Sequence, residues 1–222
     1  MTLIEFSDSY TQLTLQALPE GVCATHLECY LVNGVLKGVF PIMPTVVWSR
    51  IEGNGLEYCE INTNPVTTLK GQVITQLDSK SISVSYTVQC GDEGAAQSVD
   101  LICRSEGLES SLSLSRTIDD RWFCNGKEVS QFVGLKDIDL GITPSTNTLP
   151  IRRLNLSPGE SKELTAVWLR FPDLSLAPLA QRYTCIDSKT YLYQSVKSGY
   201  KAEINVDSDG IVVTYQHEWK RV

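Results

Sequence analysis

Four charged residues near the middle of the chain could form a polar centre. Asp137 and Asp139 lie two positions apart, so on a β-strand their carboxylates share one face. Arg152 and Arg153 follow further along the chain. Carboxylates beside a guanidinium can bind a polar ligand or exchange protons, but structural ion pairs use the same groups. The structural reading is favoured for the two aspartates, and both readings stay open for Arg152.

Hydroxyl and amide side chains fill the segment between these charges. The run TPSTNTLP, residues 143–150, places Thr143, Asn147 and Thr148 between or beside two prolines. Such side chains bond to nearby backbone and make a loop rigid without regular structure. We expect a strand to resume at residues 151–154, with Arg152 and Arg153 on opposite faces. An inward-pointing arginine needs a carboxylate partner, and Asp137 or Asp139 is available.

Aromatic residues gather in the second half of the chain. Tyr191 and Tyr193 are two apart and would share one face of a strand. An aromatic side chain with an apolar body and a polar tip suits a sugar or a lipid headgroup, and it equally suits core packing. The set consists of Trp122, Trp168, Tyr183, Tyr191, Tyr193, Tyr215 and Trp219.

Motifs for other chemistries are absent from the sequence. The two histidines, His26 and His217, stand in strand-like stretches without a nucleophile motif nearby. No glycine-rich phosphate loop occurs, and residues 207–210 (DSDG) predict a hairpin turn better than a calcium loop. Seven cysteines include no C-x-x-C pair, which predicts reduced thiols and no metal site. We therefore expect no catalytic residue and no cofactor.

Charge and composition narrow the partners. The chain has 222 residues and a formal net charge of −7, so a nucleic acid or an anionic membrane surface is disfavoured. No apolar run is long enough to span a bilayer, so no stable membrane insertion is expected. The first residues, MTLIEFSDSY, do not resemble a signal peptide, which predicts a cytoplasmic protein. The sequence says nothing about oligomeric state.

Apolar and polar residues alternate with a period of two over much of the chain. Between Ser81 and Cys90, apolar residues occupy every second position, which is typical of a strand with one buried face. Similar runs recur at intervals of roughly ten residues, separated by turn signals such as Asn33-Gly34 and Asn125-Gly126. The pattern predicts a single all-β domain over residues 1–222, with at most short helical turns.

Several spaced motifs resemble one bacterial protein family. Asp119-Asp120 and Trp122 with Asn125-Gly126 resemble its D-G-x-W…N-G element, although Asp120-Arg121 stands where glycine is usual. The other matching stretches, in the same order, are residues 137–140, 143–154, 170–172, 181–183, 191–193 and 215–222. Together they are similar to the family called "putative glycolipid-binding". The resemblance implies one large curved antiparallel sheet, a spiral roll or half-barrel similar to lipoprotein-carrier folds.

The same resemblance implies a protein that binds a glycolipid or another amphiphile in or at the mouth of the sheet. Two alternatives stay open: a scaffold with a solid core and no ligand, and an enzyme that uses Asp137, Asp139 and Arg152. The residues expected to contact a ligand are Trp122, Asn125, Asp137, Asp139, Thr143, Asn147, Thr148, Arg152, Arg153, Tyr183, Tyr191, Tyr193 and Trp219.

Overall fold

The computed structural model describes residues 28–32, 35–39, 44–63, 66–91 and 93–222. The chain divides into two compact units, Met1–Met43 and Pro44–Val222. In the first unit, strands β1 (Glu28–Val32) and β2 (Val35–Val39) pair antiparallel. The turn predicted at Asn33-Gly34, together with Cys23 and His26, lies outside the described residues. One domain over residues 1–222 stays a prediction.

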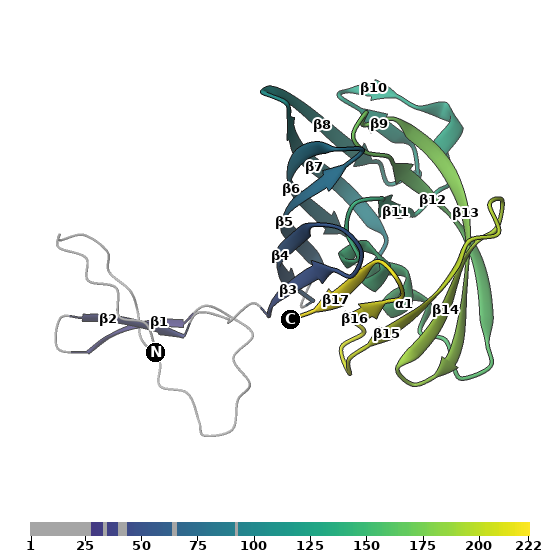
Figure 1. The fold of residues 1–222 in the computed structure, drawn as a ribbon. Helices are drawn as coiled ribbons and strands as arrows, with labels where there is room; N and C mark the ends of the chain where they lie inside the picture. The colour runs from purple at the N-terminus through teal and green to yellow at the C-terminus, as the bar shows by residue number, and fades with distance from the viewer. Residues whose placement is uncertain (1–27, 33–34, 40–43, 64–65, 92) are drawn as a thin grey trace. The chain divides into compact units, whose positions relative to one another are not determined.

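The second unit is built on one fifteen-stranded sheet that curls without closing (Figure 1). Its order is β10-β9-β8-β7-β6-β5-β4-β3-β17-β16-β15-β14-β13-β12-β11. The strands are β3 (Thr45–Arg50), β4 (Gly55–Asn62), β5 (Thr68–Leu77), β6 (Lys80–Cys90), β7 (Ala96–Ser105), β8 (Leu108–Arg116), β9 (Trp122–Cys124), β10 (Lys127–Glu128), β11 (Asp137–Leu140), β12 (Ser161–Leu169), β13 (Leu176–Asp187), β14 (Thr190–Ser195), β15 (Lys201–Val206), β16 (Val212–Tyr215) and β17 (Trp219–Arg221).

This order explains how distant parts of the sequence meet. The chain runs outward from β3 to one sheet edge at β10, crosses to the other edge at β11, and returns inward until β17 pairs with β3. The short 3-10 helix η1 (Ser130–Phe132) lies in the crossing segment. The all-β half-barrel is confirmed. The pairing of β11 with β12 is parallel, so the sheet is mixed rather than purely antiparallel.

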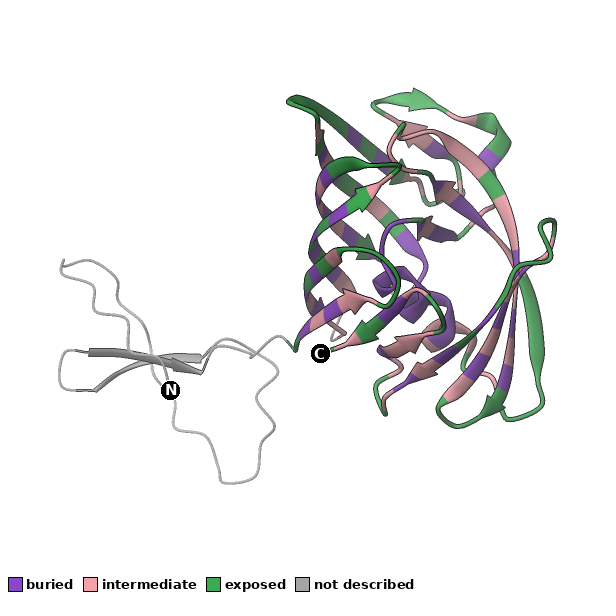
Figure 2. Ribbon diagram, in the orientation of Figure 1, coloured by how far each residue is buried: buried purple, intermediate pink, exposed green. Residues whose placement is uncertain are grey.

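The predicted alternation is borne out in burial. In β6 the side chains of Ile82, Val84, Tyr86, Val88 and Cys90 are all buried, and their neighbours face solvent in part. A strand with this pattern removes one face from water, which is the main stabilising contribution of such a sheet. Figure 2 shows the alternation as purple and green or pink bands along β4 to β8.

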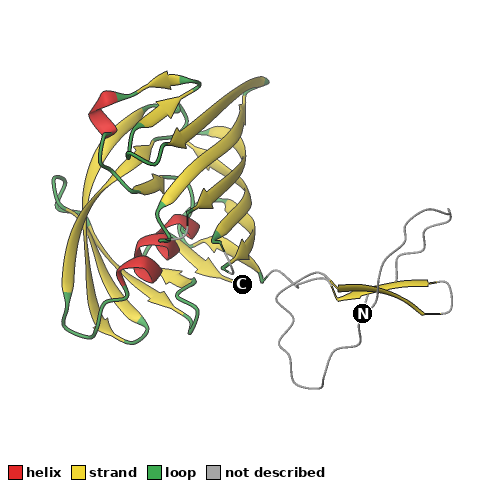
Figure 3. Cartoon of the chain, turned by 180° about the vertical axis from the view of Figure 1, so that it is seen from behind, coloured by secondary structure: helices red, strands yellow, loops and turns green. Residues whose placement is uncertain are grey.

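The segment after β11 lies inside the curl of the sheet, where Figure 3 shows it in red (η2 and α1). It contains the 3-10 helix η2 (Ser145–Asn147) and the helix α1 (Thr148–Leu154). Residues 142–151 are all buried, and we call them the plug. The interior that an empty half-barrel would leave is therefore largely filled by the protein itself.

The strand predicted at residues 151–154 is wrong, because these residues end helix α1. Pro150 is compatible with the helix since it stands in the first turn, where backbone N–H groups have no partner within the helix. Asn155 ends the helix in the left-handed conformation, with φ of 44°. Short, polar segments of this kind carry a weak periodic signal, so their helix depends on the surrounding sheet.

Three further findings bear on the sequence analysis. Five cysteines in the described part of the chain are free thiols: Cys59, Cys90, Cys103, Cys124 and Cys185. No helix of the described residues has the length and apolar character needed to cross a membrane. Residues 207–210 join β15 to β16 as the predicted hairpin turn.

Candidate functional site

A cavity of about 420 Å³ lies beside the plug, and we call it the aromatic cavity. Strand β11 and the plug contribute Asp139, Thr143 and Asn147. Strands and loops from β12 to β17 contribute the rings of Trp168, Tyr193, Tyr200, Tyr215 and Trp219. The volume is within the range of ligand pockets, and an apolar wall with few polar groups is their usual composition.

Tyr193 lies at the centre of a group of tyrosines. Its ring centroid is 5.4 Å from Tyr183, 6.2 Å from Tyr200 and 6.0 Å from Tyr215, and each pair meets edge to face. Edge-to-face contacts are a favoured geometry for aromatic pairs and fix the ring planes. Strand pairing sets this arrangement, because Tyr183 and Tyr193 stand opposite each other in β13 and β14. The cavity wall is therefore preorganised.

Of the two acidic residues that line the cavity, Glu218 pairs with Arg50 and Asp139 bonds to an amide. Asp139 is half-buried, and its Oδ2 accepts a hydrogen bond from the side-chain amide of Gln181. The same Gln181 nitrogen lies 3.2 Å from the Tyr193 hydroxyl, which accepts from it. Loss of solvation raises the pKa of Asp139 to about 6, and the bond from Gln181 partly opposes the rise. Near neutral pH, Asp139 is mainly a carboxylate with spare capacity to accept hydrogen bonds.

Arg50 lines the same cavity, although it lies far from the other lining residues in the sequence. Its guanidinium carbon lies 4.8 Å from the Trp219 ring centroid, and its Nη1 is 3.1 Å from Glu218 Oε2. Pairing of β17 with β3 produces this contact, since Trp219 stands opposite Arg50. The arrangement keeps a cation over one aromatic wall, where the negative face of the ring stabilises it.

A second acidic site lies on the other side of Thr143. Glu57 of β4 is fully buried, and its Oε1 accepts hydrogen bonds from the hydroxyls of Thr143, at 2.6 Å, and Tyr86. Ser145 Oγ lies 2.6 Å from the Tyr86 hydroxyl and 2.9 Å from Thr143 Oγ1. We call Glu57, Tyr86, Thr143 and Ser145 the Glu57 cluster. Loss of solvation raises the pKa of Glu57 to about 8.

Gly71 makes room for the Glu57 cluster. It stands opposite Tyr86 in the pairing of β5 with β6, and a Cβ there would lie 2.3 Å from the Tyr86 ring. The missing side chain lets the ring lie across β5 and its hydroxyl reach Glu57 on β4. The cluster thus bonds the plug to the sheet through side chains.

The family that this chain matches spans nearly the whole second unit. The model of the family described as "Putative glycolipid-binding" matches residues 45–221. The chain belongs to this family. It is similar to the crystal structure of a DUF1089 family protein from Pseudomonas aeruginosa, with 26% identity and a TM-score of 0.72. The match covers 78% of this chain and 95% of that one. A search of curated proteins found no significant match.

Five of the thirteen residues predicted to contact a ligand lie together in the aromatic cavity. They are Asp139, Thr143, Asn147, Tyr193 and Trp219. Tyr183 lies behind them and donates its hydroxyl to Asn147 Oδ1 at 2.8 Å. Thr148 is buried in α1. Trp122 is a core residue whose Nε1 donates to the Leu135 carbonyl at 2.8 Å.

The remaining predicted residues lie elsewhere. Arg153, rather than Arg152, pairs with Asp137, at 2.6 Å between Nη2 and Oδ2. Arg152 donates to the Asp209 carbonyl and, with Tyr191, lines a separate cavity of about 330 Å³. Because Arg152 and Asp139 line different cavities, the grouping of Asp137, Asp139 and Arg152 that an enzyme was expected to use is not formed. Asn125 lines a groove on the outer face of the sheet.

Sequence reasoning did not single out several important residues. Arg50 and Glu218 enter the aromatic cavity only through the pairing of β17 with β3, for which the sequence carries no local signal. Tyr200 stands in the loop before β15, outside any alternating run. Glu57 carried a usable signal: it is an acidic residue at an inward position of β4, between Gly55 and the buried Cys59. A charge at such a position indicates a buried polar cluster.

Proposed function

We propose that the aromatic cavity binds the polar headgroup of an amphiphile, with a glycolipid as the ligand class. The observation that carries the proposal is the position of Asp139, a carboxylate in a cavity whose wall holds five aromatic rings. Rings offer flat apolar surface to a sugar, while Asp139, Thr143 and Asn147 offer hydrogen-bond partners to its hydroxyls. The family description agrees with this class of ligand.

Two tryptophans make the proposal measurable. Trp168 and Trp219 line the aromatic cavity, whereas Trp48 and Trp122 are buried in the core away from its lining. Titration with n-octyl β-glucoside below its micelle concentration is expected to change the tryptophan emission, and native mass spectrometry to show one bound molecule. 1-Octanol, which has the same chain and no sugar, is the matched ligand control. Equal responses to octyl glucoside and 1-octanol would contradict the assignment of the cavity to a sugar headgroup.

Two variants assign the response to the cavity. Asp139→Asn removes the charge and is expected to weaken glucoside binding about tenfold, since a hydrogen bond to a charged group contributes roughly 1.5–3 kcal/mol. Arg152→Ala changes the other cavity and is expected to leave binding unchanged. In the native protein the affinity should rise as pH increases through about 6, where Asp139 ionises. A flat pH profile in Asp139→Asn completes the assignment.

A scaffold without an internal ligand is the second candidate. The burial of every plug residue favours it, because the protein fills most of the interior of the sheet itself. Under this alternative neither compound binds, and Asp139→Asn changes stability alone.

A further inference from the structure

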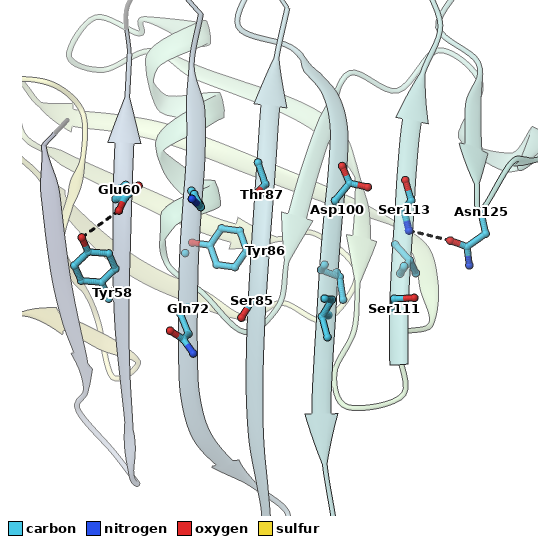
Figure 4. A pocket seen from close by; sticks show the side chains of 15 residues that line it. Tyr58, Glu60, Gln72, Ser85, Tyr86, Thr87, Asp100, Ser111, Ser113 and Asn125 are labelled. Atoms are coloured by element: carbon cyan, nitrogen blue, oxygen red, sulfur yellow. Dashed lines mark hydrogen bonds between the residues drawn. The ribbon is translucent and has the colours of Figure 1, made fainter. Parts of the chain in front are cut away.

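A groove of about 570 Å³ crosses the outer face of the sheet, and we call it the outer groove. It runs over strands β4 to β8, and Asn125 lies at its far end after β9. Figure 4 shows its side chains on successive strands, with Glu60 and Tyr58 at one end and Ser113 and Asn125 at the other. Apart from Tyr86, whose buried ring points inward, the labelled side chains belong to the outer face.

Strand register arranges these side chains in two rows. One row is Glu60, Lys70, Thr87, Asp100 and Ser113, each directly opposite the next across the strand pairs. The second row is Tyr58, Gln72, Ser85, Ile102 and Ser111. Both rows run perpendicular to the strands. Each row crosses five strands, and the four spacings of about 4.7–4.9 Å between them give the row a length of about 19 Å. This length suits an elongated ligand.

Most polar groups in the rows have spare bonding capacity. Among the described residues, the side chains of Lys70, Gln72, Thr87 and Asp100 make no hydrogen bond or ion pair with the protein. Tyr58 differs, because its hydroxyl donates to Glu60 Oε1 at 3.2 Å and its ring is about half exposed, at 47%. The groove therefore combines one oriented aromatic surface with a line of free donors and acceptors.

The same features argue against other elongated ligands. Strands β4 to β8 are each paired on both sides, so a peptide finds no free backbone edge to extend. Two carboxylates, Glu60 and Asp100, outnumber the single cation Lys70, and a chain of net charge −7 repels a polyanion. An acyl chain would leave the amide and hydroxyl groups of the rows without partners.

We propose that the outer groove binds a neutral oligosaccharide that lies across the strands. One sugar ring stacks on Tyr58, and hydroxyls along the chain bond to Gln72, Thr87 and Asp100. The site is separate from the aromatic cavity, since the two share no lining residue. It therefore does not depend on the function proposed for that cavity.

Binding is tested by calorimetry and amide chemical shifts with three neutral probes, maltohexaose, cellohexaose and hexa-N-acetylchitohexaose. The double variant Tyr58→Ala/Asp100→Ala is expected to bind the preferred probe at least tenfold more weakly. Both side chains are exposed, so the variant should fold, as circular dichroism checks. Gln76→Ala is the matched control, because Gln76 is exposed on β5 outside the groove. Shift changes in the native protein should follow the outer positions of β4 to β8.

The outcomes separate this proposal from the one for the aromatic cavity. If the double variant loses binding and Asp139→Asn keeps it, the outer groove is supported. If Asp139→Asn loses binding and the double variant keeps it, the sugar lies in the aromatic cavity and the proposal for the outer groove is overturned. Absence of binding for all three probes at millimolar concentration also overturns it, whether or not octyl glucoside binds.

Discussion

Glu57 and Asp139 are two acidic side chains in a largely apolar interior, and their surroundings differ. Both lose solvation, which raises the pKa of Glu57 to about 8 and that of Asp139 to about 6. Glu57 Oε1 accepts hydrogen bonds from the hydroxyls of Thr143 and Tyr86, and its Oε2 is buried away from both cavity and solvent. Asp139 bonds to one amide, that of Gln181, and otherwise faces the aromatic cavity.

The difference separates a structural acid from one available to a ligand. In the Glu57 cluster, protein hydroxyls occupy the carboxyl oxygen Oε1, so the group serves to hold the plug on β4. At Asp139 the protein leaves bonding capacity on the cavity side. A raised pKa by itself therefore does not identify a site, because structural clusters and binding sites both produce it. Access and the number of protein donors distinguish the two.

The largest expected effect comes from closing the space that the Glu57 cluster needs. Gly71→Ala would put a Cβ at 2.3 Å from the Tyr86 ring, so the ring must move and its bond to Glu57 breaks. We expect a loss of about 3 kcal/mol in the free energy of unfolding, measured by urea titration. Gly91→Ala is the control, since its nearest contact would be at 3.9 Å. Equal stability of the two variants contradicts the proposed role of Gly71.

The pH dependence of stability should reveal Glu57 next. Its pKa is raised from 4.5 to about 8 in the folded protein, so between these values the folded state binds more protons than the unfolded state. Stability therefore falls as pH rises from about 4.5 to 8 and is level above 8. Glu57→Gln removes this dependence, which is on the order of a few kcal/mol. Urea titrations at pH 5, 7 and 9 measure it, and parallel curves for both proteins contradict it.

A third carboxyl, Asp137, provides a paired reference for the comparison. It is buried, and Arg153 bonds both of its oxygens, with distances of 2.8 and 2.6 Å from Nη2. Arg153→Ala leaves a buried charge without a partner, and we expect a cost of about 2 kcal/mol because Arg153 itself is partly exposed. The neighbouring Arg152→Ala should cost less than about 0.5 kcal/mol. Thermal unfolding of the two variants measures the difference, and an equal loss of stability in both would contradict the role given to Arg153.

Among the three buried or half-buried carboxyl groups, the smallest effect should come from Asp139. Its pKa is raised from 3.8 to about 6, so its contribution to stability falls between these pH values and is level above 6. Because Asp139 is half-buried and partly screened, the change should be about 1 kcal/mol. Asp139→Asn should flatten the curve below pH 6 and leave the region from pH 6 to 8 unchanged. A change confined to the higher window would reverse the roles assigned to Glu57 and Asp139.

The strands were predictable because their information is local. Alternation in residues 81–90 specifies which face is buried before any partner strand is known, and β6 follows it. The motif around residues 137–154 likewise indicated the family, and the match over residues 45–221 agrees. Five predicted contact residues also meet in one cavity: Asp139, Tyr193 and Trp219 from strands of the sheet, and Thr143 and Asn147 from the plug.

The sequence by itself determined the all-β class, the inward faces of the strands and the family. The tertiary structure alone decided that residues 151–154 are helical, that Arg153 pairs with Asp137, and that Arg50 meets Trp219. Hydrophobic alternation involves residues that are close together in the sequence, so it can be recognised without the structure. Helix α1 and these pairings depend on long-range strand order, above all on β17 beside β3, which no short stretch of sequence encodes.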